Sequence, residues 1–203
     1  MIINAELESG GAGSPGGKHK MDTQRKIHPH KFALWVAIAS IIMLFAGLTS
    51  AFIVKSGQPG WEGVRTPAIF WYSTAVILVS SVTIQAALRS FKQREMARFR
   101  ILFLSTLVLG IAFLILQWIG FNYLWEHGVK FRGAGAGQFL YIIFGLHALH
   151  IIGGIVALAI MAAKEYFGRT RNYNSVPVEV ISTYWHFVDL LWIYLLIFFI
   201  WIG

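Results

Sequence analysis

The chain alternates between long, uninterrupted apolar blocks and short segments rich in glycine, proline or charge. A polar, glycine-rich tail at 1–31 precedes five such blocks, at about 32–54, 68–88, 101–125, 138–163 and 181–202. Each block is long enough to cross a hydrocarbon core of about 30 Å at about 1.5 Å per helical residue. The strands of a membrane β-barrel would instead need about 9–11 residues of alternating polarity, a pattern that these blocks lack. The pattern predicts an all-α, polytopic membrane protein, with five transmembrane helices at 32–203 behind a flexible tail.

Composition supports this class and removes several others. Of the 203 residues, 57% are apolar and only 13% are charged, which is too apolar for a soluble domain of this size. The chain has no cysteine, so it forms no disulfide and has neither a thiolate metal site nor a cysteine nucleophile. The net charge of +8 does not indicate nucleic-acid binding, because the basic residues lie in the segments between apolar blocks.

The distribution of these basic residues predicts an orientation. Of the 17 lysines and arginines, 13 lie in the tail and in the second and fourth connections, and four lie in the first and third. The positive-inside rule then places the N-terminus inside and the C-terminus outside. The same orientation puts four tryptophans at the outer interface, where an aromatic belt is expected: Trp61, Trp71, Trp125 and Trp201.

Small residues at helical spacing indicate sites of close helix contact. Gly47 and Ala51 form one such pair, and Gly153 and Ala157 another. Two interpretations stay open: the pairs hold this five-helix bundle together, or they face a larger partner subunit.

The last two blocks carry ionisable side chains at membrane depth. His147 and His150 share one helix face, and His186 and Asp189 share another, with Glu179 two turns before His186. An aspartate inside a spanning helix costs about 2.5–3.5 kcal/mol on insertion scales, so we expect these groups to face protein, lipid head groups or a wet cleft. Three milder cases are expected to bond neighbouring backbone carbonyls: Gln85, Gln117 and Asn122.

Three chemical hypotheses follow from these side chains. His147, His150, His186 and Asp189 suit a zinc or iron site by residue type, but the many histidine boxes of membrane di-iron enzymes are missing. A histidine from each of the two helices would also suit axial ligation of a haem. Proton or substrate translocation is the third, although the first three blocks contain no ionisable residue to continue a path. The sequence shows no nucleophile–base pair, phosphate loop or carboxylate pair, which disfavours catalysis by this chain alone.

Two stretches resemble subunit III of the haem–copper oxygen reductases, the cytochrome c oxidase subunit III family. The run from Tyr184 through Trp185, His186 and Asp189 to Trp192, with Glu179 ahead of it, is similar to the closing helix of that family. The run Gly-Leu-His-Ala-Leu-His at 145–150, followed by Gly153 and Gly154, resembles the family's double-histidine motif. Gln117 resembles a glutamine that closes the preceding helix, so the resemblance covers about 32–203.

This resemblance implies a five-helix form of a subunit that often has seven helices. Such a subunit is not catalytic and carries no cofactor, because haem and copper belong to the partner subunits of an enzyme that reduces oxygen and pumps protons. It contacts subunit I and the other oxidase subunits, including subunit II, and it binds phospholipid in the bacterial cytoplasmic (inner) membrane, within a larger respiratory supercomplex in some cases. The expected lipid or interhelical polar face consists of Glu179, Trp185, His186, Asp189, His147 and His150.

Two departures from the family pattern point to a scaffolding and lipid-holding role. Ile41 stands where the family has a buried carboxylate associated with proton handling. Gly120 and Phe121 stand where the family usually has Glu-Tyr. The alternatives are a haem-binding membrane anchor of another respiratory complex and a small transporter.

Overall fold

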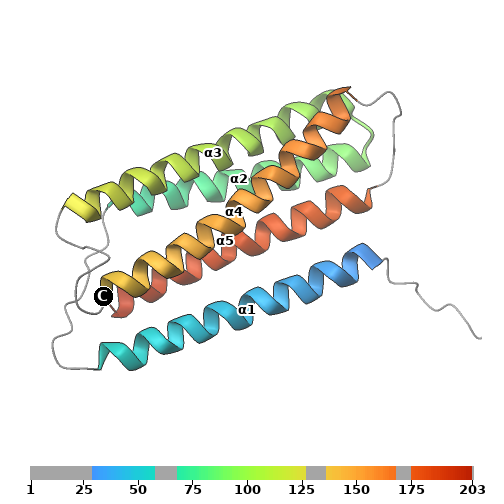
Figure 1. Cartoon of the computed structure of the whole chain (residues 1–203). Helices are drawn as coiled ribbons and strands as arrows, with labels where there is room; N and C mark the ends of the chain where they lie inside the picture. The colour runs from blue at the N-terminus through green and yellow to red at the C-terminus, as the bar shows by residue number, and fades with distance from the viewer. Residues whose placement is uncertain (1–28, 58–67, 127–135, 168–174, 203) are drawn as a thin grey trace, which may run out of the picture.

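The computed structural model describes residues 29–57, 68–126, 136–167 and 175–202. Within them the chain forms five long helices and no strand (Figure 1). The helices are α1 (Pro29–Ser56), α2 (Ile69–Lys92), α3 (Met96–Glu126), α4 (Ala136–Phe167) and α5 (Val176–Ile202). All five are long and apolar enough to span a membrane, which confirms the predicted fold class. The side chain of Trp61 lies outside the described residues.

The helices extend past the apolar blocks, because backbone hydrogen bonding continues into the polar flanks. The clearest case is 89–100, which the pattern marks as a connection. Helix α2 continues to Lys92 and α3 already begins at Met96. Two backbone hydrogen bonds close the turn between them. The Gln93 amide donates to the Arg89 carbonyl at 3.0 Å, and the Glu95 amide donates to the Ser90 carbonyl at 3.0 Å. Arg94 has a φ of 62°, the left-handed conformation that often ends a helix. A turn this short forces α2 and α3 to lie antiparallel and side by side.

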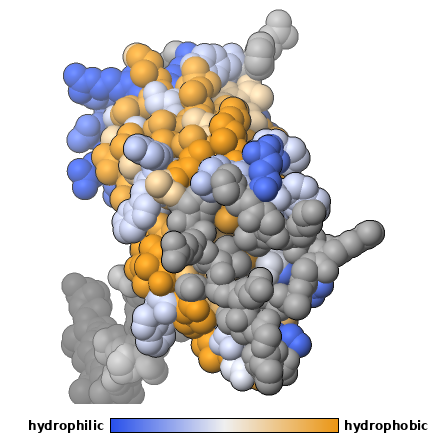
Figure 2. All heavy atoms as spheres, turned by 90° about the vertical axis from the view of Figure 1, so that its left-hand side faces the viewer, coloured by the Kyte–Doolittle hydropathy of each residue, from blue (hydrophilic) through white to orange (hydrophobic). Residues whose placement is uncertain are grey.

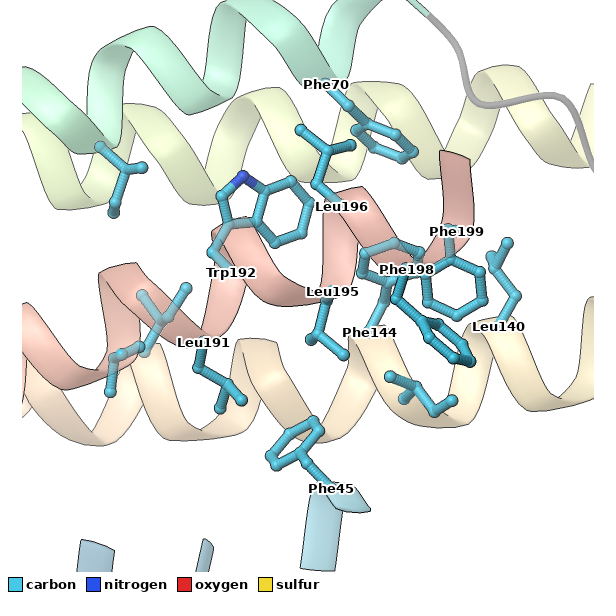
Figure 3. Packing of buried hydrophobic residues seen from close by; sticks show 14 of the residues in the cluster. Phe45, Phe70, Leu140, Phe144, Leu191, Trp192, Leu195, Leu196, Phe198 and Phe199 are labelled. Carbon is cyan, nitrogen blue, oxygen red and sulfur yellow. The ribbon is translucent and has the colours of Figure 1, made fainter. Parts of the chain in front are cut away.

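Helix α5 lies at the centre of the bundle. It contacts α1, α2 and α4, whereas α1 and α2 have no contact with each other in the described part of the chain. Figure 3 shows the rings of Phe45, Phe70 and Phe144, from α1, α2 and α4, around Trp192, Leu195 and Phe199 of α5. Large apolar side chains are also exposed on all five helices, as expected for helices in contact with lipid, and Figure 2 shows some of them on one face. Because lipid tails are as apolar as leucine, hydrophobic burial contributes little to packing here, and close fit and polar contacts contribute most.

The glycines that produce this fit are not those indicated by spacing. A Cβ on Gly47 or Gly153 would meet nothing within 4 Å, so the interpretation that they hold this bundle together is wrong. A Cβ on Gly110 would instead lie 2.8 Å from Cη2 of Trp185, and one on Gly154 would lie 3.1 Å from Cζ3 of the same ring. The buried glycines admit a large ring from α5, whereas Gly47 and Gly153 leave the outer faces of α1 and α4 open.

Candidate functional site

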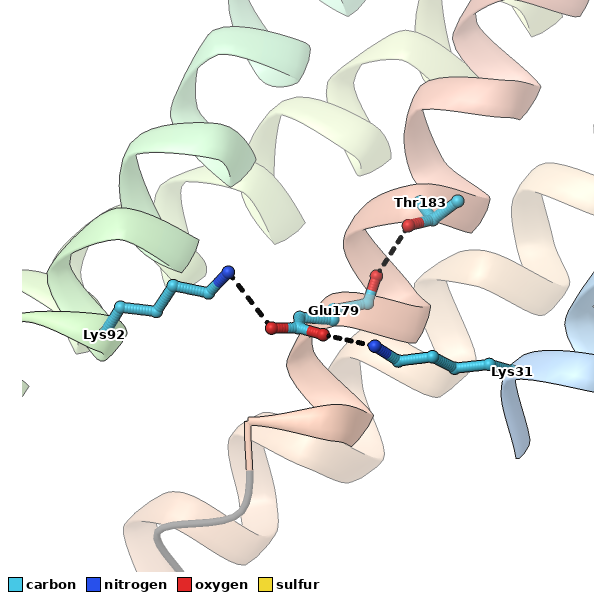
Figure 4. A network of polar contacts seen from close by, with 4 residues as sticks. All are labelled: Lys31, Lys92, Glu179 and Thr183. Atoms are coloured by element: carbon cyan, nitrogen blue, oxygen red, sulfur yellow. Dashed lines mark hydrogen bonds and ion pairs between the residues drawn. The ribbon is translucent and has the colours of Figure 1, made fainter. Parts of the chain in front are cut away.

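The Glu179 carboxylate joins three helices at one end of the bundle (Figure 4). One oxygen, Oε2, lies 2.8 Å from Nζ of Lys31 in α1, and the other, Oε1, lies 3.0 Å from Nζ of Lys92 in α2. Since α1 and α2 do not otherwise touch in the described residues, Glu179 is a bridge between them. Both lysines are substantially exposed, so water and salt weaken each pair.

Trp185 fills the middle of the bundle and is only 2% exposed. Its indole N–H donates to Oγ of Ser80 at 2.9 Å, while Gly110 of α3 and Gly154 of α4 lie against the ring. A single side chain of α5 therefore contacts three other helices. This position explains why a tryptophan is present at this depth: its ring fills the interior and its one donor has a buried acceptor.

His186 faces α2 and is held at both ring nitrogens. Nδ1 lies 2.6 Å from Oγ of Ser81, and Nε2 lies 3.2 Å from Oε1 of Gln85. The Gln85 carbonyl only accepts, so Nε2 carries the proton, and the Ser81 hydroxyl donates to Nδ1. The expectation that Gln85 bonds a backbone carbonyl is wrong, because its amide oxygen accepts from this imidazole. His186 is only half-buried, and it lines an open cavity of about 370 Å³ with Ser81, Gln85 and Arg89.

Asp189 lies one turn further along the same face and is 3% exposed. Neither carboxyl oxygen has a hydrogen-bond partner among the described residues. The Ser81 hydroxyl of α2 is bonded to Nδ1 of His186, not to this carboxyl. His186 and Asp189 therefore share one face of α5, but only His186 is held by α2.

The two histidines of α4 are separated from this pair. His147 is 1% exposed and stacks on Trp192, with ring centroids 5.5 Å apart and planes at 26°. Neither of its nitrogens has a partner among the described residues. His150 donates from Nδ1 to the carbonyl of Leu146 at 2.7 Å, and both rings lie edge-on to Phe45 of α1. The expected polar face therefore divides into an α2 side and an α1 side. No group of three candidate metal ligands comes together in the described ranges.

The two positions at which the family pattern would have a carboxylate, 41 and 120, are both buried. Ile41 belongs to the main apolar cluster. A Cβ on Gly120 would lie 2.6 Å from Cε1 of Phe70. A glutamate at position 120 would therefore require the Phe70 ring to move. The Phe70 ring of α2 occupies the space that a carboxylate side chain at this position would need.

Sequence reasoning missed the hydroxyl groups of α2. Ser80 accepts from Trp185, Thr74 accepts from the Trp192 indole at 3.0 Å, and Ser73 accepts from Nε2 of Gln117 at 3.2 Å. Gln117 thus bonds a side chain, not the expected backbone carbonyl. The sequence could have indicated this hydroxyl-bearing face of α2. Ser73 and Ser80 lie seven residues apart in an apolar block and so share one helix face.

The polar seam of this bundle consists of the α5 side chains Trp185, His186 and Trp192 and the α2 groups that they bond. Five apolar helices with such a seam along the last one define a polytopic α-helical membrane protein. The sequence model of the family "Cytochrome c oxidase subunit III" matches residues 12–203, and the chain belongs to that family.

Curated relatives carry the same description. A probable cytochrome c oxidase subunit 3 of Mycobacterium leprae (strain TN) is 29% identical over 162 residues, covering 78% of this chain and 80% of the relative. A probable cytochrome c oxidase subunit 3 of Nocardia farcinica (strain IFM 10152) is 27% identical over 188 residues, covering 89% of this chain and 93% of the relative. The cytochrome c oxidase subunit 3 of Bacillus sp. (strain PS3) is 26% identical over 165 residues, covering 79% and 80%. The chain is thus an oxidase subunit III and a multi-pass membrane protein.

Proposed function

We propose that this chain is the non-catalytic subunit III of a respiratory haem–copper oxidase and that it stabilises the catalytic subunit and holds structural phospholipid. The holoenzyme reduces oxygen and pumps protons, and its haem and copper belong to the partner subunits. The chain lies in the bacterial inner membrane with its N-terminus inside and its C-terminus outside. Family membership supports the assembly, and the distribution of basic residues supports the orientation.

The observation that carries the lipid-holding role is the exposed apolar face of α5 between α1 and α2. These two helices do not touch in the described residues, and Leu190 and Ile197 of α5 are 65% and 62% exposed. Glu179 closes one end by pairing with Lys31 and Lys92. We call this exposed face and the adjoining cavity at Arg89 the groove, and its apolar length and charged end are complementary to an acyl chain and its head group.

The head group of this lipid would bind in the cavity beside His186. Arg89 lines that cavity and has no ion pair among the described residues, in contrast to the two lysines that Glu179 neutralises. Its guanidinium and the Ser81, Gln85 and His186 groups suit a phosphate oxygen better than a cation. The groove therefore favours an anionic phospholipid.

The open glycines support contact with a larger partner. Gly47 of α1 and Gly153 of α4 have free space above them, and close packing in a membrane depends on such positions. We assign these faces to the catalytic subunit. A proton-handling role finds little support, since buried Ile41 and Gly120 occupy the positions of family carboxylates.

Purification of the complex from native membranes in mild detergent tests the assignment. We expect a haem–copper subunit in fixed stoichiometry, and no Soret band in this chain once it is separated. A Soret band that stays with the separated chain would identify a haem anchor instead, and a chain that purifies alone would favour the transporter.

The lipid role has a separate test in the purified complex. Arg89→Gln should reduce the amount of phosphatidylglycerol retained, as measured by native mass spectrometry. Arg98→Gln is the matched control, because Arg98 pairs with Glu95 in an exposed position away from the groove. Equal retention in the two variants would contradict a head-group site at Arg89.

A further inference from the structure

A second cavity lies on the other side of the bundle, between α3 and α4. It has a volume of about 280 Å³ and is lined by Trp118, Phe121, Asn122, Trp125, Tyr141 and Gly145. These residues occupy the last turns of α3 and the early turns of α4, so the cavity lies near the opposite end of the bundle from Glu179. None of the residues that the polar seam uses lines it.

Aromatic rings form most of the wall. Trp118 is 70% exposed and Trp125 is 52% exposed, although each has a large apolar ring available for packing. Phe121 and Trp125 lie against Tyr141, with centroids 5.9 Å and 6.2 Å apart. A Cβ on Gly145 would meet nothing within 4 Å, so the absence of a side chain there keeps the cavity open.

Asn122 supplies an amide to this cavity, whose lining also includes the tyrosine Tyr141. Its amide is exposed and makes no hydrogen bond within the described part of the chain, so the expectation of a bond to a neighbouring carbonyl is wrong. An amide both donates and accepts, and here it is free to do so with a ligand.

The charge pattern of the wall selects the ligand. None of the lining residues is ionised, and ring faces carry the negative part of the aromatic quadrupole, so they attract cations and repel anions. Glu126 follows Trp125 at the end of α3 and adds negative charge nearby. Exposed Ile111 and Ile115 of α3 and Leu149 of α4 continue the two helices toward the middle of the membrane, where an acyl chain would lie.

We propose that this α3–α4 cavity binds the ammonium head group of a zwitterionic phospholipid. The rings of Trp118 and Trp125 contact the ammonium, the Asn122 amide donates to a phosphate or ester oxygen, and Gly145 leaves room for the head group. The groove beside Arg89 suits a phosphate and an anionic lipid, so the two sites differ in head-group charge. This proposal does not depend on the role assigned to that groove.

The test uses the assembled oxidase complex, delipidated and then titrated with either phosphatidylethanolamine or phosphatidylglycerol, with bound lipid counted by native mass spectrometry. Trp118→Leu combined with Trp125→Leu should weaken one phosphatidylethanolamine site about five- to ten-fold, as expected for the loss of two ring contacts, and leave phosphatidylglycerol binding unchanged. Trp201→Leu is the matched control, since Trp201 is 84% exposed near the same end of the bundle but does not line the cavity.

Two further variants separate binding from folding. Gly145→Leu fills the cavity and leaves every ring in place, so it should remove the same phosphatidylethanolamine site. Asn122→Leu should weaken that site without changing its preference for the ammonium. Equal loss of both lipids in the tryptophan variant, or retention of phosphatidylethanolamine in Gly145→Leu, would overturn the proposal and leave the rings as an ordinary aromatic belt.

Discussion

The side of α5 that faces α2 carries polar contacts along much of its length, whereas the side that faces α1 is packed mainly by aromatic rings. Toward α2, Trp185, His186 and Trp192 each bond a hydroxyl or amide. Toward α1, Phe52 lies edge-on to Phe198 and Phe199, with centroids 5.5 Å and 5.1 Å apart.

Few polar links hold the α1 side. Thr49 and Tyr194 share one hydrogen bond at 3.0 Å, and Lys31 pairs with Glu179 at the end of the helix. Hydrogen bonds at membrane depth are directional and fix the register of two helices, while ring contacts tolerate small shifts. The comparison indicates that α2, α3 and α5 form the rigid part of the subunit and that α1 is the helix most easily displaced.

The largest expected effect concerns the unpaired group of the polar side. Asp189→Leu should improve insertion of α5 by about 2.5–3.5 kcal/mol, because it removes a carboxyl from the membrane interior. It should also loosen the assembled complex or its bound lipid. A glycosylation-based insertion assay measures the first effect, and subunit stoichiometry with lipid content measures the second. Unchanged stoichiometry, lipid and long-term turnover would show that Asp189 has no role in assembly.

Overpacking the rigid part should come next. Gly110→Ala places a methyl group 2.8 Å from the Trp185 ring, which should cost about 1–3 kcal/mol of unfolding free energy in detergent. Gly47→Ala is the control, because it meets nothing within 4 Å and should be neutral or stabilising in the separated subunit. If both variants unfold alike, the close fit around Trp185 does not govern stability.

A double-mutant cycle on Trp185→Phe and Ser80→Ala measures one polar contact directly. Hydrogen bonds between membrane helices average about 0.6 kcal/mol and reach about 1.7 kcal/mol, and we expect a coupling energy in that range. The corresponding cycle on Trp192→Phe and Thr74→Ala should give a similar value, since in both pairs an indole N–H donates to a hydroxyl of α2, at 2.9 Å and 3.0 Å. Coupling near zero in both cycles would remove the distinction between the α2 side and the α1 side.

The smallest effect is expected at the charged end. Glu179→Gln weakens two partly exposed ion pairs worth about 0.2–1 kcal/mol each, so α1 should move away from α2. Spin labels on α1 and α2 would report a broader distance distribution, and high salt should reproduce it in the unmodified chain. Glu95→Gln, which breaks only the exposed pair with Arg98, should leave the distribution unchanged. A distribution insensitive to both Glu179→Gln and salt would mean that packing alone positions α1.

The number and type of secondary-structure elements follow from the amino-acid sequence alone. Twenty or more apolar residues leave the backbone no alternative to a helix in lipid, so five blocks predict five helices. The strings around His147 and His186 likewise indicated the family. These properties are local, because each depends on a single segment and the solvent around it.

Which side chains meet was decided by helix rotation and depth, and those depend on all five helices together. Spacing indicated Gly47 and Gly153 as contact sites, but the packed glycines are Gly110, Gly120 and Gly154. His147 and His186 both lie in motifs that resemble the family. His147 nevertheless stacks on Trp192, whereas His186 bonds Ser81 and Gln85. A short apolar sequence does not encode the neighbour that a helix face will meet, because one rotation about the helix axis exchanges lipid for protein.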